Sequence, residues 1–289
     1  MRSAPRLSFE FFPPKTPEME AKLWLAVKQL EPLAPHFVSV TYGAGGTTRE
    51  RTHEIVARIR RETPLEPAAH LTCVGASRQE VDVVALNYWQ AGIRHIVALR
   101  GDPPVGSGPY RPRGDGYERA SDLVAGLARV ANFEISVAAY PETHPEATSP
   151  TTDLDNLKRK IDAGARRAIT QFFFDTEIYL RFVDRARAAG VTVPIVPGLL
   201  PIGNFAQVAK FAAACGASVP GWVAAQFEGL NDDARARAAI AVEIAAEQCR
   251  RLRGAGIDEL HFYTLNRADL VLAICDAIGV RQALPVSGG

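Results

Sequence analysis

The sequence predicts a single closed (β/α)8 TIM barrel, and three observations support this α/β fold class. Eight short, apolar, strand-like runs recur along the 289 residues. Between them lie segments whose apolar residues are three and four positions apart, the period of an amphipathic helix. No low-complexity linker divides the chain. Alternating strands and helices predict parallel pairing with helical crossovers, and eight units in about 250 residues match a barrel. We expect one domain over residues 1–289; an open doubly wound sheet is the alternative.

Each predicted strand is a short run of apolar, β-branched and aromatic residues bounded by turn residues. In chain order the runs are 7–12 (LSFEFF), 36–43 (HFVSVTYG), 68–73 (AAHLTC), 95–101 (HIVALRG), 135–141 (ISVAAYP), 168–174 (AITQFFF), 193–200 (VPIVPGLL) and 259–266 (ELHFYTLN). The clearest predicted helices span 19–30, 51–59, 80–89, 154–161 and 234–252. Residues 102–118 contain too much Gly and Pro for a helix, and a loop of that length is usually functional or mobile.

The composition indicates an ordinary soluble globular protein. With 47% apolar residues, 22% charged residues and a net charge of +1, nucleic acid and membrane surfaces are poor candidate partners. The N-terminus has no apolar run typical of a signal peptide, and the most apolar later stretch, 206–227, contains Lys210, Gly216 and Pro220. Four widely spaced cysteines predict buried, reduced thiols: Cys73, Cys215, Cys249 and Cys275. We expect a cytoplasmic protein whose barrel exterior associates into a homo-oligomer.

Polar residues occur late in several predicted strands. Strand side chains alternate between two faces, and barrel active sites lie at the C-terminal ends of the strands. The predicted inward pairs are Ser8 and Glu10, Ser39 and Thr41, Ala68 and His70, Ala98 with Arg100 and Asp102, and Ala138 and Tyr140, with Gln171 late in the sixth strand. This convergence predicts an active site at one rim. Each residue alone also has a structural explanation: a paired Glu10, mutual neutralisation of Arg100 and Asp102, and a core His70.

A second polar group opens the helix predicted after the fifth strand, in D153-L-D-N-L-K-R-K160. Helical spacing places its polar residues on neighbouring turns. An ordinary solvated face explains the pattern, and so does a clamp for ribose hydroxyls and phosphates, which need acceptors beside cations. The glycine-rich run 43–48 lacks the last glycine of a dinucleotide fingerprint, and H53-E-I-V-A57 lacks the second histidine of a zinc-protease helix. We therefore expect no metal site.

Eight stretches, in order from position 9 to 267, match one protein family. They are F9-E-F-F-P-P14, F37-V-S-V-T-Y-G43, H70-L-T-C73, G92-I-R-H-I-V-A-L-R-G-D102, S136-V-A-A-Y-P-E142, N156-L-K-R-K160, I169-T-Q-F-F-F-D175 and H261-F-Y-T-L-N-R267. With these, the sequence resembles the bacterial methylenetetrahydrofolate reductases. The resemblance implies a flavoprotein of one-carbon metabolism, in the direction of methionine biosynthesis. NADH or NADPH would reduce FAD and leave, and reduced FAD would then convert 5,10-methylenetetrahydrofolate to 5-methyltetrahydrofolate.

The resemblance also implies binding residues. FAD contacts of the family map onto Thr41, His70, Leu99, Arg100, Gly101, Asp102, Ala120, Tyr140, His144, Asp153, Asn156, Arg159 and Lys160. Folate contacts map onto Glu10, Asp102, Gln171, Gln207, Phe211, Tyr263 and Arg267. The family often has a tyrosine just before A120-S-D122, where this chain has Arg119 and, two residues earlier, Tyr117. Either residue is a candidate for the local FAD contact.

The implied chemistry gives these residues roles. Opening the substrate ring requires a proton on its N10, and Glu10 is the candidate general acid, with a pKa that we expect partial burial to raise. Asp102 would stabilise the cationic iminium form of the opened substrate. Gln171 suits the pterin edge, and Arg267 suits the carboxylates of the glutamate tail. Two alternatives stay open: a flavin-free barrel that transfers a one-carbon group, and a non-catalytic regulator that binds folate or flavin.

Overall fold

The strands and helices alternate along the chain as the sequence predicts. The computed structural model describes residues 4–42, 49–103, 106, 108–230 and 232–280, so the glycine-rich run 43–48 lies outside the described residues. The strands are β1 (Arg6–Phe11), β2 (Phe37–Val40), β3 (Pro67–Thr72), β4 (His95–Leu99), β5 (Glu134–Ala139), β6 (Arg167–Thr170), β7 (Ile195–Val196), β8 (Gly198–Leu199) and β9 (Glu259–Tyr263). The helices are α1 (Pro17–Leu30), α2 (Arg49–Glu62), α3 (Arg78–Gln90), α4 (Ala120–Val130), α5 (Pro150–Asp162), α6 (Thr176–Ala188), α7 (Phe205–Cys215), α8 (Gly221–Gln226), α9 (Ala234–Gly254) and α10 (Asp269–Ala277).

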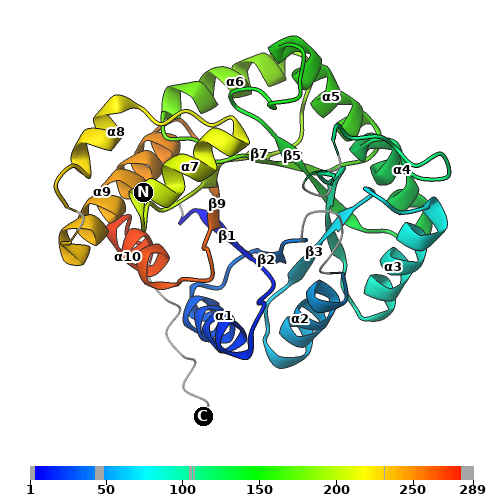
Figure 1. Cartoon of the computed structure of the whole chain (residues 1–289), viewed down its shortest axis with the longest axis horizontal. Coiled ribbons are helices and arrows are strands. Elements are labelled where there is room, and N and C mark those ends of the chain that lie inside the picture. Colours follow the sequence, from blue (N-terminus) through cyan, green and yellow to red (C-terminus); the bar gives the residue numbers. More distant parts are fainter. Residues whose placement is uncertain (1–3, 43–48, 104–105, 107, 231, 281–289) are drawn as a thin grey trace.

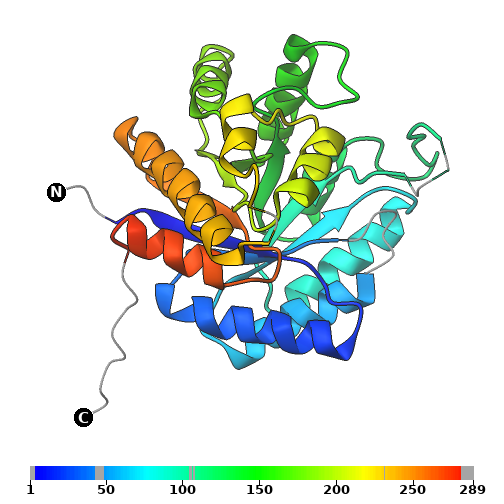
Figure 2. The same cartoon turned by 60° about the vertical axis from the view of Figure 1, so that its left-hand side comes forward.

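The sheet closes through a strand that a proline interrupts. All described pairings are parallel, and the strand order is β7-β6-β5-β4-β3-β2-β1-β9-β8. β7 pairs with β6 and β8 pairs with β9, while only Pro197 separates β7 from β8. Proline has no N–H for the ladder, yet its carbonyl accepts a bond from His261 N at 3.0 Å. The predicted seventh strand is therefore two short pieces of one nearly closed barrel, which the helices surround (Figures 1 and 2). The barrel prediction is confirmed.

Local signals fix where the helices begin. Thr16, Ser149 and Asn204 cap α1, α5 and α7 by accepting a bond from a backbone N–H of the first turn, which satisfies a donor that the helix leaves free. Ser77 and Glu80 form a reciprocal capping box on α3. Several of these helices start directly after the loops that follow strands, so the caps also fix the polar loops at the C-terminal end of the barrel.

Alternate strand residues face the helices and the barrel interior. Phe9 and Ala98 belong to the large core between strands and helices, whereas Val97 and Leu99 pack in a separate interior cluster with Phe37. The predicted phase was therefore wrong for the fourth strand, where it placed Ala98 inside. The reason is that β4 ends at Leu99, so the alternation counted back from Arg100 and Asp102 does not apply beyond the strand. The chain then turns at Gly101, whose φ is +83°. A Cβ at this position would lie 2.6 Å from the Val74 side chain.

Ionic groups close the N-terminal end of the barrel interior. The side chain of Arg167, the first residue of β6, is 7% exposed and forms ion pairs with Glu134 and Glu259, the first residues of β5 and β9. Its guanidinium lies 5.3 Å from the ring centroid of Phe37. His95, at the start of β4, packs edge-on against the same ring at 4.5 Å. We call Arg167, Glu134, Glu259 and His95 the lower cluster.

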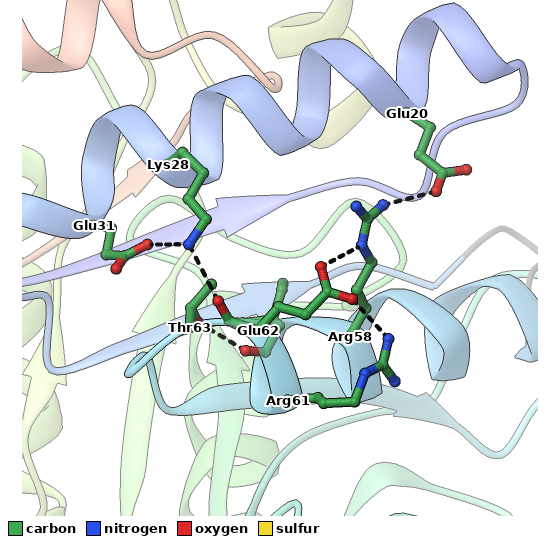
Figure 3. Close-up of polar contacts among 8 residues, drawn as sticks. Glu20, Lys28, Glu31, Arg58, Arg61, Glu62 and Thr63 are labelled. Atoms are coloured by element: carbon green, nitrogen blue, oxygen red, sulfur yellow. Dashed lines mark hydrogen bonds and ion pairs between the residues drawn. The ribbon is translucent and has the colours of Figure 1, made fainter.

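An ion pair and a hydrogen bond join α1 to α2 on the outside of the barrel (Figure 3). Glu20 of α1 accepts from Arg58 of α2 at 3.1 Å, and Lys28 donates to the backbone carbonyl of Glu62 at 3.1 Å. Arg61 pairs with the Glu62 carboxylate at 2.7 Å. Such solvent-exposed pairs contribute at most about 1 kcal/mol each. They fix how two outer helices lie together and are far less buried than the charges inside the barrel.

The thiols and the helix lengths bear on two expectations drawn from composition. All four cysteines are free thiols; Cys73, Cys249 and Cys275 are buried, and Cys215 is half-buried. This confirms the expectation of mostly buried, unpaired thiols. Among the described residues, no helix has both the length and the apolar character needed to cross a membrane.

Candidate active site

Glu10 lies inside the barrel near its C-terminal end, among side chains from three other strands. Its Oε2 is 3.2 Å from Nε2 of His70 on β3, 3.5 Å from Nε2 of His261 on β9, and accepts from Ser39 Oγ of β2 at 3.4 Å. Parallel pairing sets Glu10 opposite Ser39 on one side and Tyr263 on the other. The inward phase predicted for β1, β2 and β3 thus brings these residues together. We call Glu10, Ser39, His70 and His261 the upper cluster.

The two histidines decide the charge of Glu10. Burial raises the pKa of this carboxyl, but the charge of His70 and the close polar contacts of both imidazoles outweigh burial and lower the pKa to about 2. The expectation of a raised pKa was therefore wrong for this structure, because it considered burial without the imidazoles. Glu10 is a carboxylate held beside two groups that can carry a proton.

His261 was missed by the sequence reasoning. It is fully buried, and its Nδ1 lies 2.8 Å from Ser8 Oγ, which leaves Nε2 facing Glu10. The signal that could have identified it is the same period-two alternation: a β9 strand that turns Tyr263 inward also turns His261 inward. The pair of histidines becomes visible only when β3 and β9 are both placed beside β1.

A cavity of about 570 Å³ opens beside the ends of β4 and β5. Ligand pockets in proteins span roughly 300–1,000 Å³. All predicted FAD residues except Thr41 and His70 line it: Leu99, Arg100, Gly101, Asp102, Ala120, Tyr140, His144, Asp153, Asn156, Arg159 and Lys160. His70 is instead in the upper cluster, and Thr41 follows β2, where its backbone N bonds to the Phe11 carbonyl. The predicted clamp on α5 therefore forms part of a cavity wall.

Lys160 is a buried cation in that wall. The residue is 6% exposed, and its Nζ donates to the backbone carbonyl of Ala138 on β5. Burial lowers the pKa of Lys160 to about 8, against the opposing effect of Asp153. Asp153 in turn accepts a bond from the backbone N of His144 at 2.9 Å. A buried ammonium with a backbone carbonyl as its hydrogen-bond acceptor is suited to an anionic or polar ligand in the cavity.

Arg100 is held at the cavity mouth by the predicted partner Asp102 and by two residues that the sequence reasoning did not select, Glu146 and Tyr110. Its Nη1 pairs with Glu146 at 2.6 Å and its Nη2 with Asp102 at 3.5 Å. The guanidinium also lies 4.6 Å from the ring centroid of Tyr110, within the range of a cation–π contact. Tyr110 belongs to the predicted loop 102–118, whose described residues contain no helix or strand. The loop thus contributes to the cavity wall.

Arg119 and Tyr117, the two candidates for an FAD contact near the start of α4, lie in different surroundings. Arg119 lines the cavity. Tyr117 is 3% exposed, and its hydroxyl donates to Asp82 at 2.7 Å. The Tyr117 ring packs against Gly126, where even a Cβ would come within 2.2 Å of the hydroxyl oxygen. Arg119 is therefore the residue that faces the candidate FAD cavity, and Tyr117 is a core residue.

Apart from Glu10 in the upper cluster and Asp102 at the cavity mouth, the predicted folate residues do not line that cavity. The Tyr263 hydroxyl donates to the Thr170 carbonyl at 2.8 Å, and Phe211 stacks on Phe172 at 5.3 Å. Tyr263 meets the same Phe172 ring edge-on at 6.2 Å. Gln171, Phe172 and Tyr140 line a small crevice. Phe211 is 48% exposed, and Gln207 and Arg267 are also exposed. These residues form an aromatic wall with polar groups at its edge.

Comparisons with known proteins show the family of this chain. Residues 2–279 match the family described as methylenetetrahydrofolate reductase. The chain belongs to this family. The 5,10-methylenetetrahydrofolate reductase of Escherichia coli (strain K12) is 54% identical over 278 residues, covering 96% of this chain and 92% of that protein. A probable methylenetetrahydrofolate reductase (NADH) of Oryza sativa subsp. japonica is 36% identical and covers 97% of this chain and 49% of its own length.

A solved structure shares the fold at low identity. It is an uncharacterized protein from Clostridium thermocellum that binds two copies of 5-methyl-5,6,7,8-tetrahydrofolic acid. The TM-score is 0.62 at 14% identity, over 96% of both chains. This likeness supports the barrel fold, and membership of the reductase family stands on the sequence matches.

Proposed function

We propose that this family member is an FAD-dependent oxidoreductase that reduces 5,10-methylenetetrahydrofolate to 5-methyltetrahydrofolate with NADH or NADPH. The donor would leave before the folate enters, in a ping-pong order. The observation that carries the flavin part is the cavity of about 570 Å³ whose wall joins the buried Lys160 to the acceptors Asp153 and Asn156. The family match supports the folate part.

The cavity residues fit the polar parts of FAD. Arg100, Arg159 and Lys160 offer cations for a pyrophosphate, and Asp153 and Asn156 offer acceptors for ribose or ribityl hydroxyls. When bound, FAD supplies the two-electron carrier chemistry that links the nicotinamide to the folate. The chain holds and orients this group. A flavin-free barrel would not need this combination of cations and acceptors in the cavity wall.

Glu10 would deliver the proton that opens the folate ring. The Nε2 atoms of His70 and His261 lie 3.2 and 3.5 Å from Oε2 of Glu10, so either imidazole is placed to pass a proton to Glu10, which would then give it to the substrate N10. A pterin bound over the upper cluster would exclude water and add to the burial that raises the pKa of this carboxyl. Glu10 would thus become an acid only with substrate in place.

Other residues would bind and stabilise the folate. Asp102 is 77% exposed at the cavity mouth, where its charge would favour the cationic iminium form of the opened substrate. Gln171 would bond the pterin edge, and Tyr263 and Phe211 would form an apolar wall for the rings. Arg267 would bind the carboxylates of the glutamate tail.

The test is a two-step titration of the purified protein, followed by visible absorption under anaerobic conditions. The protein is loaded with FAD, reduced with NADH or NADPH, and then mixed with 5,10-methylenetetrahydrofolate. The proposal expects a flavin band that bleaches with the nicotinamide and returns with the folate. A protein that binds no FAD contradicts the flavin part, and a bleached band that the folate does not restore contradicts the folate part.

A further inference from the structure

The turn after β9 has an unusual backbone. Leu265 and Asn266 both have positive φ, +50° and +57°, and the Arg267 N–H closes the turn on the Thr264 carbonyl at 2.9 Å. Asparagine tolerates the left-handed region, whereas a leucine there is strained. Leu265 is also 45% exposed, so burial of its own side chain does not compensate for the strain. Other contacts must hold this turn.

The Asn266 side chain supplies two of these contacts. It is buried; its Oδ1 accepts from Phe12 N at 3.0 Å, and its Nδ2 donates to Phe12 O at 2.9 Å. In the β1–β9 ladder, Thr264 N donates to Glu10 O, so the next parallel bond would run from Phe12 N to Thr264 O. That carbonyl instead accepts from Arg267. The Asn266 amide replaces the missing rung where the strand turns away.

Thr264 ties the same turn to the residue that carries the candidate acid. Its backbone N and its Oγ1 both donate to the Glu10 carbonyl, at 3.1 and 2.7 Å, and its Oγ1 accepts from Asn266 N at 3.1 Å. Pro13, which follows Phe12, has no N–H to offer. Bonds at Glu10 and Phe12 therefore join the end of β1 and the turn of Arg267 into one unit.

We propose that Asn266 is a positioning residue for folate reduction: by bonding the backbone of Phe12, two residues after Glu10, it clamps the end of β1 to the turn that carries Arg267. The proposal rests on the proposed function, in which Glu10 gives the proton and Arg267 binds the glutamate tail. The clamp fixes the separation of these two groups, so one bound folate reaches both. Asn266 itself acts only through the two backbones, and the strained turn persists because the clamp requires it.

The test replaces the amide by a carboxylate in Asn266→Asp. This side chain can still accept from Phe12 N but cannot donate to Phe12 O, so the end of β1 and the turn should move apart. Because small displacements of reacting groups cost up to about 10²-fold in rate, we expect folate-dependent flavin reoxidation to slow at least about tenfold at saturation. Folate binding should weaken as well. Flavin reduction by NADH should stay within about twofold of wild type.

Two sets of controls separate positioning from folding. Asn132→Asp makes the same chemical change at an exposed residue between α4 and β5, at the opposite end of the barrel, and should match wild type. Thr264→Val removes the hydroxyl bonds to Glu10 and Asn266, and Thr264→Ser keeps them. Thr264→Val should slow folate-dependent flavin reoxidation without slowing flavin reduction, as Asn266→Asp does. Thr264→Ser should keep most of the wild-type reoxidation rate. This pair decides the question if Asn266→Asp does not fold.

Three results would overturn the clamp. Asn266→Asp with wild-type folate kinetics contradicts it, as does a parallel loss of both half-reactions with a lower melting temperature, which indicates a merely structural role. Equal behaviour of Thr264→Val and Thr264→Ser contradicts it too. If the unmodified protein itself fails to reoxidise with folate, the proposed function has failed, and this outcome is distinct from a working wild type with an equally working Asn266→Asp variant.

Discussion

The two ends of the barrel interior hold buried ionic groups of different kinds. In the lower cluster, Arg167 carries a permanent charge and pairs with two glutamates, at the starts of β5 and β9. In the upper cluster, Glu10 meets two imidazoles instead, at 3.2 and 3.5 Å. A guanidinium keeps its proton at any ordinary pH, whereas a carboxylate beside imidazoles can exchange one. The lower cluster is thus suited to closing the barrel, and the upper cluster to moving a proton.

The comparison predicts the largest effect for Glu10→Gln. The amide keeps the size of the side chain but cannot give a proton to the folate, so folate-dependent reoxidation should fall about 10³-fold, as for loss of a general acid. Flavin reduction by NADH should remain within a few-fold of wild type. Stopped-flow measurement of both half-reactions on one preparation checks this. Equal losses in the two half-reactions would refute the role of Glu10 as proton donor.

At the other end, Arg167→Met should affect stability and leave the chemistry intact. Removing the guanidinium leaves Glu259, which is 16% exposed, without its buried partner. Because Glu134 is more exposed, we expect a loss of about 2–3 kcal/mol in the free energy of unfolding, below the full range for a buried pair. Urea denaturation measures it. Arg61→Met, in the exposed network of Figure 3, is the matched control and should cost less than about 1 kcal/mol.

Turnover measurements test whether Arg167→Met leaves the chemistry intact. Folate turnover per folded Arg167→Met molecule should equal that of wild type, because the lower cluster lies away from the candidate site. A stable variant with impaired turnover would show that the two ends of the interior are not functionally distinct.

His95 makes the lower cluster sensitive to acid. Burial lowers the pKa of His95 to about 3, while an unfolded histidine titrates near 6.5. Between these values the unfolded chain binds one more proton, so stability is complete above about pH 6.5 and falls as the pH drops. From pH 7 to pH 5 this group should cost about 2 kcal/mol of unfolding free energy. Denaturation measured at pH 7 and at pH 5 should show a smaller change in unfolding free energy for His95→Gln than for wild type. An identical change in both proteins would contradict the role of His95 in the acid sensitivity.

Lys160, a buried cation in the cavity wall, should affect cofactor binding. We expect its substitution to have the smallest effect of the four substitutions. Lys160→Met keeps the length of the side chain but removes the cation from the cavity wall, and we expect about tenfold weaker FAD binding, the size of one charge-assisted hydrogen bond. Flavin fluorescence titration of the apoprotein measures it. Lys158→Met is the matched control, because Lys158 lies on the same helix and pairs with Asp162. Equal affinities for the two variants would remove Lys160 from the proposed FAD site.

Strand alternation predicted much of the fold and the upper rim from local patterns alone. It placed Glu10, Ser39 and His70 on one interior face, as the structure does. Strand alternation failed at β4, because the strand ends at Leu99 and the charged residues from which its phase was counted lie beyond that end. The interruption of the seventh strand at Pro197 depends on pairing with two different neighbours, which a single segment does not reveal.

The charge of Glu10 could not be predicted from its own segment either. The pKa of Glu10 is lowered by His70 and His261, which come from strands far apart in the sequence. Partial burial alone would raise that pKa. The clamp of Asn266 on Phe12 likewise joins residues 254 positions apart, and it depends on a turn conformation that leucine does not favour.

Infrared difference spectroscopy reports directly whether Glu10 takes up a proton when folate binds. Spectra of the oxidised, FAD-loaded protein at neutral pH would be recorded with and without 5,10-methylenetetrahydrofolate, for wild type and for Glu10→Gln. We expect a carboxylate in the free protein and a protonated-carboxyl band that appears with folate in wild type and is missing in Glu10→Gln. A folate complex without that band, or a band that persists in Glu10→Gln, would contradict the role of Glu10 as the proton donor.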